Sequence, residues 1–275
     1  MKKYDPRSQP MISYAQTGED VVLNRAFEGQ AGGFYIDVGA WDPVVDSVTK
    51  HFYDSGWRGI NIEPVPHYYE RLVAERSGDI NLRVAVGAGE EKKAQFVEFE
   101  GSGLSGISDT LNRAAIDALG LGFPEKSIDV EVMPLAEITS RYAQCEVDFL
   151  KIDVEGAERS VILSAEWRAF RPRVILVEAI TPLSCEPAWF VWEGLLFQAG
   201  YQFALFDGIN RFYYRAEEPE MRQRLAVPAN ALDHYVTARC KALQDRAAAL
   251  EATLAALTPP ERTGQAKDSI ASSQA

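Results

Sequence analysis

The stretch FLKIDVEGAE, Phe149 to Glu158, decides the fold. Its first four residues are apolar apart from one lysine, which is typical of a strand buried on both faces of a parallel sheet. The strand ends in Asp153, Glu155 and a glycine, and residues 157–163 then have the pattern of a helix. Open α/β sheets bind ligands at the carboxyl ends of their strands. The stretch therefore predicts an α/β fold with carboxylates at the binding edge of a parallel sheet.

Three other segments have the same layout. GFYIDVGAWDP is an apolar strand that ends in Asp37 and Gly39, GINIEPVP ends in Glu63, and VILVEA ends in Glu178. Because the carboxyl ends of parallel strands meet at one edge of a sheet, we expect these acids to lie close together. Such an edge is the usual position of a nucleotide-type cofactor.

The order of the predicted elements indicates the topology. Strands that alternate with helices imply right-handed crossovers and a mostly parallel sheet. The DGIN turn between residues 201–206 and 211–215 predicts a closing antiparallel hairpin. We expect core strands at 33–38, 59–62, 81–86, 148–153 and 174–179, a strand at 94–99 that forms a hairpin with 81–86, a short strand at 128–132, and helices within 14–27, 47–55, 67–76, 157–163 and 192–199.

The ends of the chain differ in composition from its centre. We expect a flexible N-terminus at 1–13, a folded domain at 14–218 with a glycine-rich insertion or lid at 101–127, an amphipathic helix at 229–258 and a disordered tail at 259–275. In the helix Val236, Leu243, Leu250 and Leu257 recur every seven residues, with Cys240, Ala247 and Leu254 at the second seam position. This pattern is typical of a short coiled coil. Self-association and folding back onto the domain both remain open.

Composition excludes several classes of protein. A chain of 275 residues with 47% hydrophobic content can bury a full core. Its net charge of −12 excludes a large nucleic-acid footprint, and no apolar run is long enough to span a membrane. The three cysteines have no CxxC spacing, so we expect neither a disulfide framework nor a zinc site. Without a recognisable signal peptide, the expected location is the cytoplasm.

The turn after the first core strand restricts the cofactor. A dinucleotide site needs GxGxxG there, whereas this chain has DVGAWDP, which disfavours a nicotinamide-dependent oxidoreductase. An aspartate with one glycine suits a cationic ligand that has no phosphate at the turn. S-adenosyl-L-methionine meets both conditions. Gly39 would let the backbone approach it closely, and Glu63 is placed to accept the ribose hydroxyls.

Several blocks of the sequence resemble the FkbM family of class I S-adenosylmethionine-dependent methyltransferases. The blocks are YAQTGED, FYIDVGAWDP, SVTKHFYDSGWRGINIEPVP, GLSGI, DFLKIDVEGAE, RPRVILVEA and FDGINRFYY. They occur in the family's order over residues 14–215. The resemblance implies a Rossmann-like fold and O-methylation, often of sugar hydroxyls in glycans and polysaccharides.

The resemblance also implies roles for particular residues. Asp37, Gly39 and Ala40 would contact the methionine portion of the cofactor and Glu63 its ribose, while Gln16, Glu19 and Asp20 of the opening block would fold over it. The alternative for Glu19 and Asp20 is a helix cap, because the helix dipole favours acids in a first turn.

Methyl transfer to a hydroxyl requires that one proton be removed by a positioned base. Asp153 is the first candidate, with Glu155 and Glu178 next, and Asp153 would also lie beside the sulfonium. Lys151 shares a strand face with Asp153, so it would hold a carboxylate ionised or touch the substrate oxygen. The alternative for Lys151 is a structural ion pair with Glu155.

The expected site contains no metal. Clustered carboxylates do suit hard cations, but no histidine is placed to help, and acids beside a sulfonium already have a partner. The expected function is O-methylation of a sugar hydroxyl. The alternatives are methylation of a polyketide or other small-molecule hydroxyl, and a non-catalytic scaffold that binds cofactor and recruits partners through the C-terminal helix, which would also mediate homo-oligomerisation.

Overall fold

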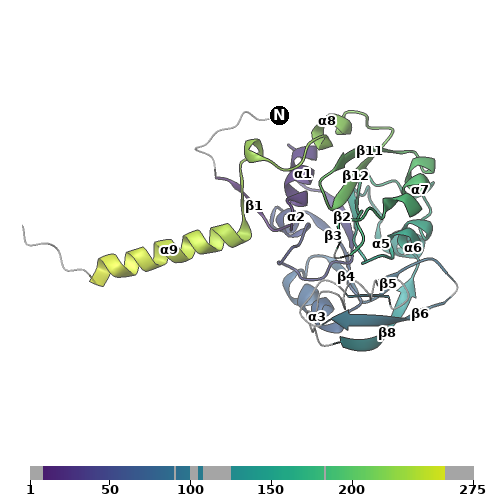
Figure 1. Cartoon of the computed structure of the whole chain (residues 1–275), viewed down its shortest axis with the longest axis horizontal. Coiled ribbons are helices and arrows are strands. Elements are labelled where there is room, and N and C mark those ends of the chain that lie inside the picture. Colours follow the sequence, from purple (N-terminus) through teal and green to yellow (C-terminus); the bar gives the residue numbers. More distant parts are fainter. Residues whose placement is uncertain (1–8, 90, 100–104, 108–124, 183, 258–275) are drawn as a thin grey trace, which may run out of the picture. The chain divides into compact units, whose positions relative to one another are not determined.

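The computed structural model of the chain describes residues 9–89, 91–99, 105–107, 125–182 and 184–257 (Figure 1). The chain divides into two compact units, residues 1–237 and residues 238–275. The first unit holds both large sheets and the packed helices, and the second contains helix α9.

A seven-stranded sheet forms the centre of the first unit. Its order is β11-β12-β10-β9-β2-β3-β4, and β12 alone runs in the opposite direction to the other strands of this sheet. This confirms the predicted Rossmann-like α/β fold with a mostly parallel sheet and a closing antiparallel hairpin. The strands are β2 (Phe34–Val38), β3 (Arg58–Ile62), β4 (Ile80–Leu82), β9 (Phe149–Ile152), β10 (Val174–Glu178), β11 (Tyr201–Phe206) and β12 (Asn210–Arg215).

Helices cover both faces of this sheet (Figure 1). One face packs against α5 (Leu135–Tyr142), α6 (Glu158–Leu163) and α7 (Glu193–Gln198), and the other against α1 (Glu19–Ala26), α2 (Lys50–Asp54) and α8 (Met221–Leu225). Successive side chains of a strand point to opposite faces. Phe149 of β9 accordingly joins the α1 side of the core and Leu150 joins the α5 side. Both sides are apolar, which explains the nearly continuous hydrophobic runs of the strands.

One row of polar residues interrupts the α1 side of the core. Lys151, Asp37, Asn61 and Asn81 lie opposite one another on four neighbouring strands, in the order β9, β2, β3, β4. Lys151 Nζ lies 3.3 Å from Asp37 Oδ1, and Asn61 Nδ2 donates a hydrogen bond of 2.9 Å to Asn81 Oδ1. We name these four residues the polar row.

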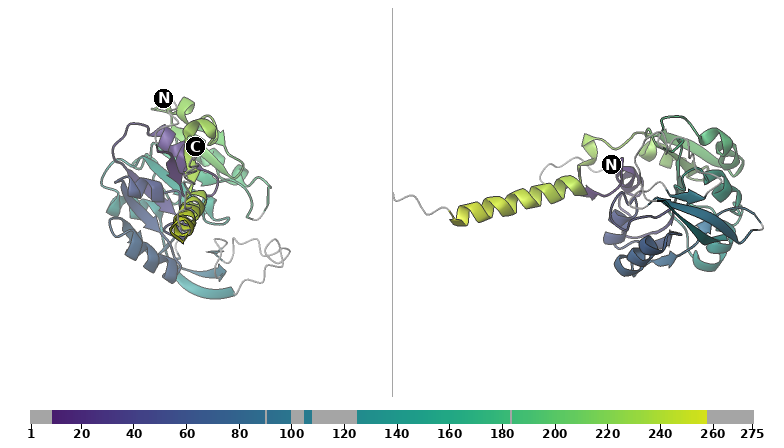
Figure 2. Two further views of the ribbon diagram at one scale, coloured as in Figure 1. Left: turned by 90° about the vertical axis from the view of Figure 1, so that its left-hand side faces the viewer. Right: turned by 60° about the horizontal axis from the view of Figure 1, so that its bottom comes forward.

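A second sheet has the order β5-β8-β6-β7 and lies beside α3 (Pro66–Glu75) in both views (Figures 1 and 2). Its strands are β5 (Ala85–Val86), β6 (Lys93–Phe99), β7 (Gly106–Ile107) and β8 (Glu125–Met133). The prediction of one strand at 81–86 was wrong, because the chain leaves the main sheet after Leu82 and Ala85 then packs against Tyr68. The predicted hairpin partner at 94–99 pairs instead with β8.

The predicted insertion or lid at 101–127 is only partly visible. Residues 105–107 contribute β7 and residues 125–127 begin β8, so these short pieces extend the second sheet. Residues 101–104 and 108–124 lie outside the described part of the chain, so the lid stays a prediction.

The two ends of the first unit pair with each other. β1 (Met11–Ser13) runs parallel to β13 (Tyr235–Thr237), so residues that we expected in a flexible N-terminus form a strand. The helix predicted from residue 229 begins only at Ala238. Residues before Ala238 form other elements: a capping box of Asn230 and Asp233 caps the N-terminus of the short helix η2 (Ala231–Asp233), and β13 follows after His234.

Helix α9 (Ala238–Leu257) presents exposed leucines at three of the four positions of the predicted seven-residue series. Leu243, Leu250 and Leu257 are 59%, 58% and 75% exposed, whereas Val236 of the predicted series lies in β13. The predicted tail at 259–275 lies outside the described residues. Within the described chain, no helix combines the length and apolar character that a membrane crossing needs.

Candidate active site

A pocket opens at the carboxyl ends of β2, β3 and β9, where the sequence predicted one. Eight of the predicted site residues line it: Gln16, Glu19, Gly39, Ala40, Glu63, Lys151, Asp153 and Glu155. Asp20, Asp37 and Glu178 do not line it, and each has a different position. The predicted set therefore separates into a lining and a supporting group.

Asp20 supports the N-terminal segment. It is fully buried, and its carboxylate accepts hydrogen bonds from Ser13 Oγ at 2.7 Å and from the Tyr14 amide at 2.8 Å. Burial raises the pKa of Asp20 to about 6, which these donors oppose. In the structure Asp20 thus holds β1 against α1, and it does not line the pocket.

Glu19 lies in the pocket wall and is anchored from two sides. The Thr17 amide donates a hydrogen bond of 2.8 Å to Glu19 Oε2, and Asn210 Nδ2 donates one of 3.1 Å to Oε1. Burial raises the pKa of Glu19 to about 7. The alternative of a helix cap describes part of its role, because Glu19 is also the first residue of α1 after the N-cap Gly18.

Glu63 forms the end of the pocket next to β3. Its Oε2 accepts a hydrogen bond of 2.9 Å from the Trp41 amide, and its Oε1 accepts one of 2.8 Å from the Val65 amide. The side chain is only 5% exposed, and this burial raises its pKa to about 7 against the pull of the two amides. Each carboxylate oxygen can accept a further hydrogen bond, so Glu63 is a preformed acceptor for two donors.

The turn after β2 joins the two ends of the pocket. Gly39 has a φ of 81°, and its amide donates a hydrogen bond of 3.1 Å to the Ile62 carbonyl just before Glu63. A side chain at Gly39 would collide with the backbone carbonyl of Asp153. We expected this glycine to let the backbone approach a cofactor, but the approach that requires it is that of the loop after β9.

Lys151 ties β9 to this turn. Its ammonium donates a hydrogen bond of 2.7 Å to the Gly39 carbonyl and lies 3.3 Å from Asp37 Oδ1 and from Asp153 Oδ2. Burial lowers the pKa of Lys151, but the carboxylates of Asp153 and Asp37 outweigh burial and raise it. The alternative ion pair with Glu155 does not form among the described residues. Asp37 is therefore a buried partner of Lys151, supported by Thr49 Oγ1 at 3.2 Å, and lies beneath the pocket surface.

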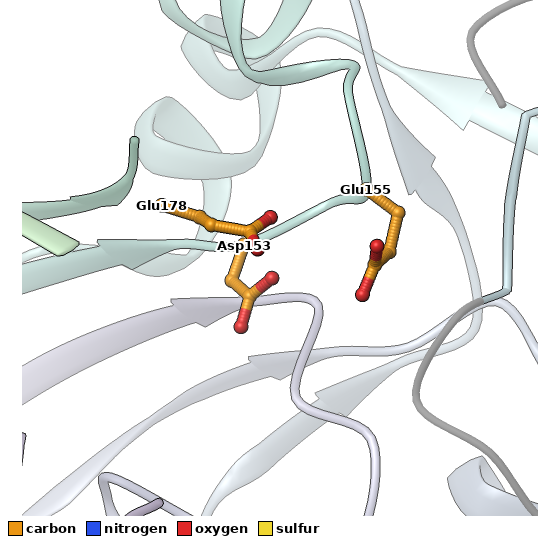
Figure 3. Close-up of side chains that lie close together, drawn as sticks. All are labelled: Asp153, Glu155 and Glu178. Carbon is orange, nitrogen blue, oxygen red and sulfur yellow. The ribbon is translucent and has the colours of Figure 1, made fainter. Parts of the chain in front are cut away.

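Three carboxylates gather beside β9: Asp153 and Glu155 line the pocket, and Glu178 at the end of β10 lies next to them. One oxygen each of Asp153, Glu155 and Glu178 can be chosen so that all three atoms lie within 4.8 Å of one another. Figure 3 shows them converging from the end of β10 and from the loop after β9. Burial raises the pKa of Glu155 and of Glu178 well above the usual range, and the carboxylate of Asp153 raises both further.

Sequence reasoning missed the aromatic wall of the pocket. Trp41 and Tyr68 both line it, with their ring centroids 5.6 Å apart. Trp41 lies two residues after Gly39 and has a backbone conformation in the left-handed region, with φ 48°. An aromatic in DVGAWDP and a tyrosine in the first turn after PVP were visible signals, because both directly follow strand ends that carry acids.

Comparison with known proteins identifies the family. The family model described as "Methyltransferase FkbM domain" matches residues 37–203. A comparison with curated proteins finds no match. Among solved structures, the C-terminal domain of precorrin-6Y C5,15-methyltransferase from Rhodobacter capsulatus is 13% identical, with 78% of this chain and 98% of that chain covered and a TM-score of 0.32. Because the family model covers more than half of the sequence, the chain belongs to the FkbM methyltransferase family.

Proposed function

We propose that this chain is an S-adenosylmethionine-dependent O-methyltransferase that acts on a hydroxyl, most directly one of a sugar in a glycan or polysaccharide. The observation that carries the proposal is the pocket at the carboxyl ends of β2, β3 and β9, which is lined by Glu63 after β3 and by Asp153 and Glu155 after β9. Membership of a methyltransferase family supports the proposal that the transferred group is a methyl group.

The donors and acceptors in the pocket fit this cofactor. Glu63 offers two carboxylate oxygens that are already fixed by amides, which suits the two adjacent hydroxyls of a ribose. Asp153, 37% exposed, offers negative charge to a sulfonium or an ammonium group. Trp41 and Tyr68 offer ring faces to an adenine. Gly39 and Ala40 leave room along the turn between these ends.

The chain's own residues account for orientation and for the proton. Bound S-adenosylmethionine supplies a methyl group that is already activated on sulfur, so the enzyme must hold an oxygen in line with it. Asp153 is our candidate to accept the proton that the hydroxyl loses, because it borders the pocket and is exposed to it. Lys151 fixes the orientation of that carboxylate from the buried side.

An aromatic surface beside β10 supports a sugar acceptor. The Trp189 ring lies 5.0 Å from that of Phe190 and 5.2 Å from that of Phe206. Phe190 is 73% exposed, and the Ala188 amide ties this segment to Ala179, next to the end of β10. Aromatic faces suit sugar rings. A polyketide hydroxyl is the alternative acceptor, and the same rings would accommodate it.

Two experiments test the proposal. Isothermal titration should show micromolar binding of S-adenosylmethionine and much weaker binding of NADH, and the reverse order would refute the cofactor. Mass spectrometry of cell glycans, with and without this protein, should show the loss of one methyl substituent. A scaffold function predicts instead that Asp153→Asn and Glu155→Gln leave the cellular phenotype intact.

We further propose that the enzyme acts in the cytoplasm as a homo-oligomer held by α9. Leu243 and Leu250 are exposed seven residues apart on this helix, as a coiled-coil seam requires. Cys145 and Cys185 are exposed thiols, which suits a reducing compartment. Light scattering on a sizing column should show that Leu250→Asp lowers the molar mass, whereas Ala248→Asp, which makes the same charge change at an exposed position of this helix, serves as the control.

A further inference from the structure

The cluster of Asp153, Glu155 and Glu178 is short of positive charge. Lys151 is the nearest cation, and its ammonium has three donors, which face the Gly39 carbonyl, Asp37 and Asp153. No ion pair joins Glu155 or Glu178 to a cation in the described part of the chain. Two of the three half-buried carboxyl groups thus have no cation beside them that would compensate a negative charge.

One atom of the cluster shows directly that a partner is missing. Glu178 Oε2 is buried and has no hydrogen-bond partner among the described residues. A buried carboxylate oxygen without a donor is costly, and such an atom in a folded protein calls for an explanation such as an unseen ion. Glu178 comes from β10 and the other two acids from the loop after β9, so the site is assembled by the sheet itself.

We propose that Asp153, Glu155 and Glu178 bind a divalent metal cation at the acceptor end of the pocket. The inference rests on the proposed function only for the role of the cation. It departs from our sequence-based expectation of no metal, which assumed that a sulfonium is the partner of these acids and noted that no histidine is placed to help.

The spacing of the oxygens suits a hard cation. Ligands on opposite sides of Ca²⁺ lie roughly 5 Å apart and those of Mg²⁺ roughly 4 Å apart, given the usual bond lengths. The three oxygens all lie within 4.8 Å of one another, so they are close enough to share a cation of either size after a small closure. Three carboxylates leave coordination positions open for water or substrate. Oxygen-only ligands favour Mg²⁺, Mn²⁺ or Ca²⁺ over zinc or copper.

A cation there would help the proposed reaction without replacing the base. It would stabilise the developing negative charge on an acceptor hydroxyl and lower the pKa of that hydroxyl. A carboxylate that binds a cation through one oxygen keeps the other, so Asp153 can still take the proton. The carbon–oxygen bond then forms as the sulfur–carbon bond breaks, and the products are the methyl ether, S-adenosylhomocysteine and one proton on the carboxylate.

Electron paramagnetic resonance with Mn²⁺ tests the site. The full chain, stripped with EDTA, is titrated with MnCl₂, and bound Mn²⁺ is then displaced with MgCl₂ or CaCl₂. We expect one bound ion per chain, and at least tenfold weaker binding in Glu178→Gln and in Glu155→Gln. Glu186→Gln, an exposed acid on the loop after β10, is the control and should bind like the parent.

Each outcome decides the inference. Absence of Mn²⁺ binding at millimolar concentration, or binding unchanged in both variants, overturns it. If Glu178→Gln fails to fold by circular dichroism, Glu155→Gln decides alone. Titration of S-adenosylmethionine in EDTA separates this inference from the proposed function. Cofactor binding without Mn²⁺ binding refutes the cation alone, and Mn²⁺ binding without cofactor binding refutes the cofactor alone.

Discussion

The two ends of the pocket carry the same functional group in opposite states. At the β3 end, each oxygen of Glu63 is held by a backbone amide. Near the ends of β9 and β10, the carboxylates of Asp153, Glu155 and Glu178 face one another, and one oxygen has no donor among the residues that the structure describes. A carboxylate fixed by amides is suited to recognise hydroxyls. A group of carboxylates without donors is suited to take up protons or cations, so we assign recognition to the first end and chemistry to the second.

The largest expected effect comes from the chemical end. Asp153→Asn keeps the size of the side chain but removes the base, so we expect methyl transfer to slow by about 10²–10⁴-fold. Formation of S-adenosylhomocysteine with a glycan acceptor measures this rate. Affinity for S-adenosylmethionine should fall far less than the rate.

The matched control for this variant is Asp54→Asn on α2, whose carboxylate is exposed and forms an ion pair with Lys50. It should leave the rate unchanged. Equal rates for Asp153→Asn and the parent protein would remove Asp153 from the chemical step and erase the contrast between the two ends.

The next effect concerns the turn that connects the ends. Gly39→Ala would place a methyl group against the Asp153 carbonyl in a left-handed conformation, so we expect a loss of more than about 3 kcal/mol in the free energy of unfolding. Gly56→Ala is the control, because Gly56 also has a positive φ but open space around it. That change should cost only about 1–2 kcal/mol. Urea unfolding measures both, and equal losses would contradict the close approach.

A smaller effect is expected at the recognition end. Glu63→Gln keeps the shape but removes the charge from two hydrogen bonds, so affinity for S-adenosylmethionine should fall about 10–100-fold, since a hydrogen bond to a charged group contributes about 1.5–3 kcal/mol. Isothermal titration measures the affinity. Glu75→Gln, an exposed acid on α3, should bind like the parent. A rate loss in Glu63→Gln at saturating cofactor would contradict a purely recognising role.

The smallest effect is a pH dependence of cofactor affinity. Because the pKa of folded Glu63 is raised to about 7 from its ordinary 4.5, the folded protein holds a proton between these pH values that the unfolded chain has lost. The Glu63 contribution to the free energy of unfolding therefore falls as the pH rises from 4.5 to 7. Ribose hydroxyls bind best to an ionised carboxylate. The affinity for S-adenosylmethionine should therefore increase as the pH rises from 4.5 to 7, by less than tenfold per pH unit.

Titration at several pH values checks this dependence. Glu63→Gln should flatten the profile. Glu19 also lines the pocket and also has a pKa raised to about 7, so Glu19→Gln is the necessary comparison. A profile that flattens only in Glu19→Gln would move the titration to the wall formed by α1.

Most of the fold could be predicted because its signals are local. Apolar runs that end in acids marked the core strands, and the DGIN turn marked the closing hairpin. Helix α5 was missed although Leu135, Ile138 and Thr139 have helical spacing and are buried. The division of residues 81–86 could not be predicted, because it depends on which sheet each residue joins in space.

The candidate site could be predicted only as a set of residue types. The acids at strand ends identify the edge, but whether an acid faces the pocket depends on its partners. Asp20 is bound by Ser13, which lies seven residues before it, and Asp37 is bound by Lys151, which is distant in sequence. Strand register could have indicated the second pair, because Asp37 and Lys151 occupy equivalent positions on adjacent strands. Glu178 and Asp153 converge because β9 and β10 are neighbours in the sheet, and this strand order is not evident from the sequence.

The polar row has a consequence for how the strands align. When strands are apolar on both faces, a register shift of two residues still buries similar apolar surface. Hydrophobicity alone therefore specifies their register weakly. Lys151 lies opposite Asp37, and Asn61 lies opposite Asn81. Any shift in register would place a charge or an amide group against apolar side chains. The few hydrophilic side chains of the polar row thus favour a single register. That register brings the acids of separate strands to one edge of the sheet.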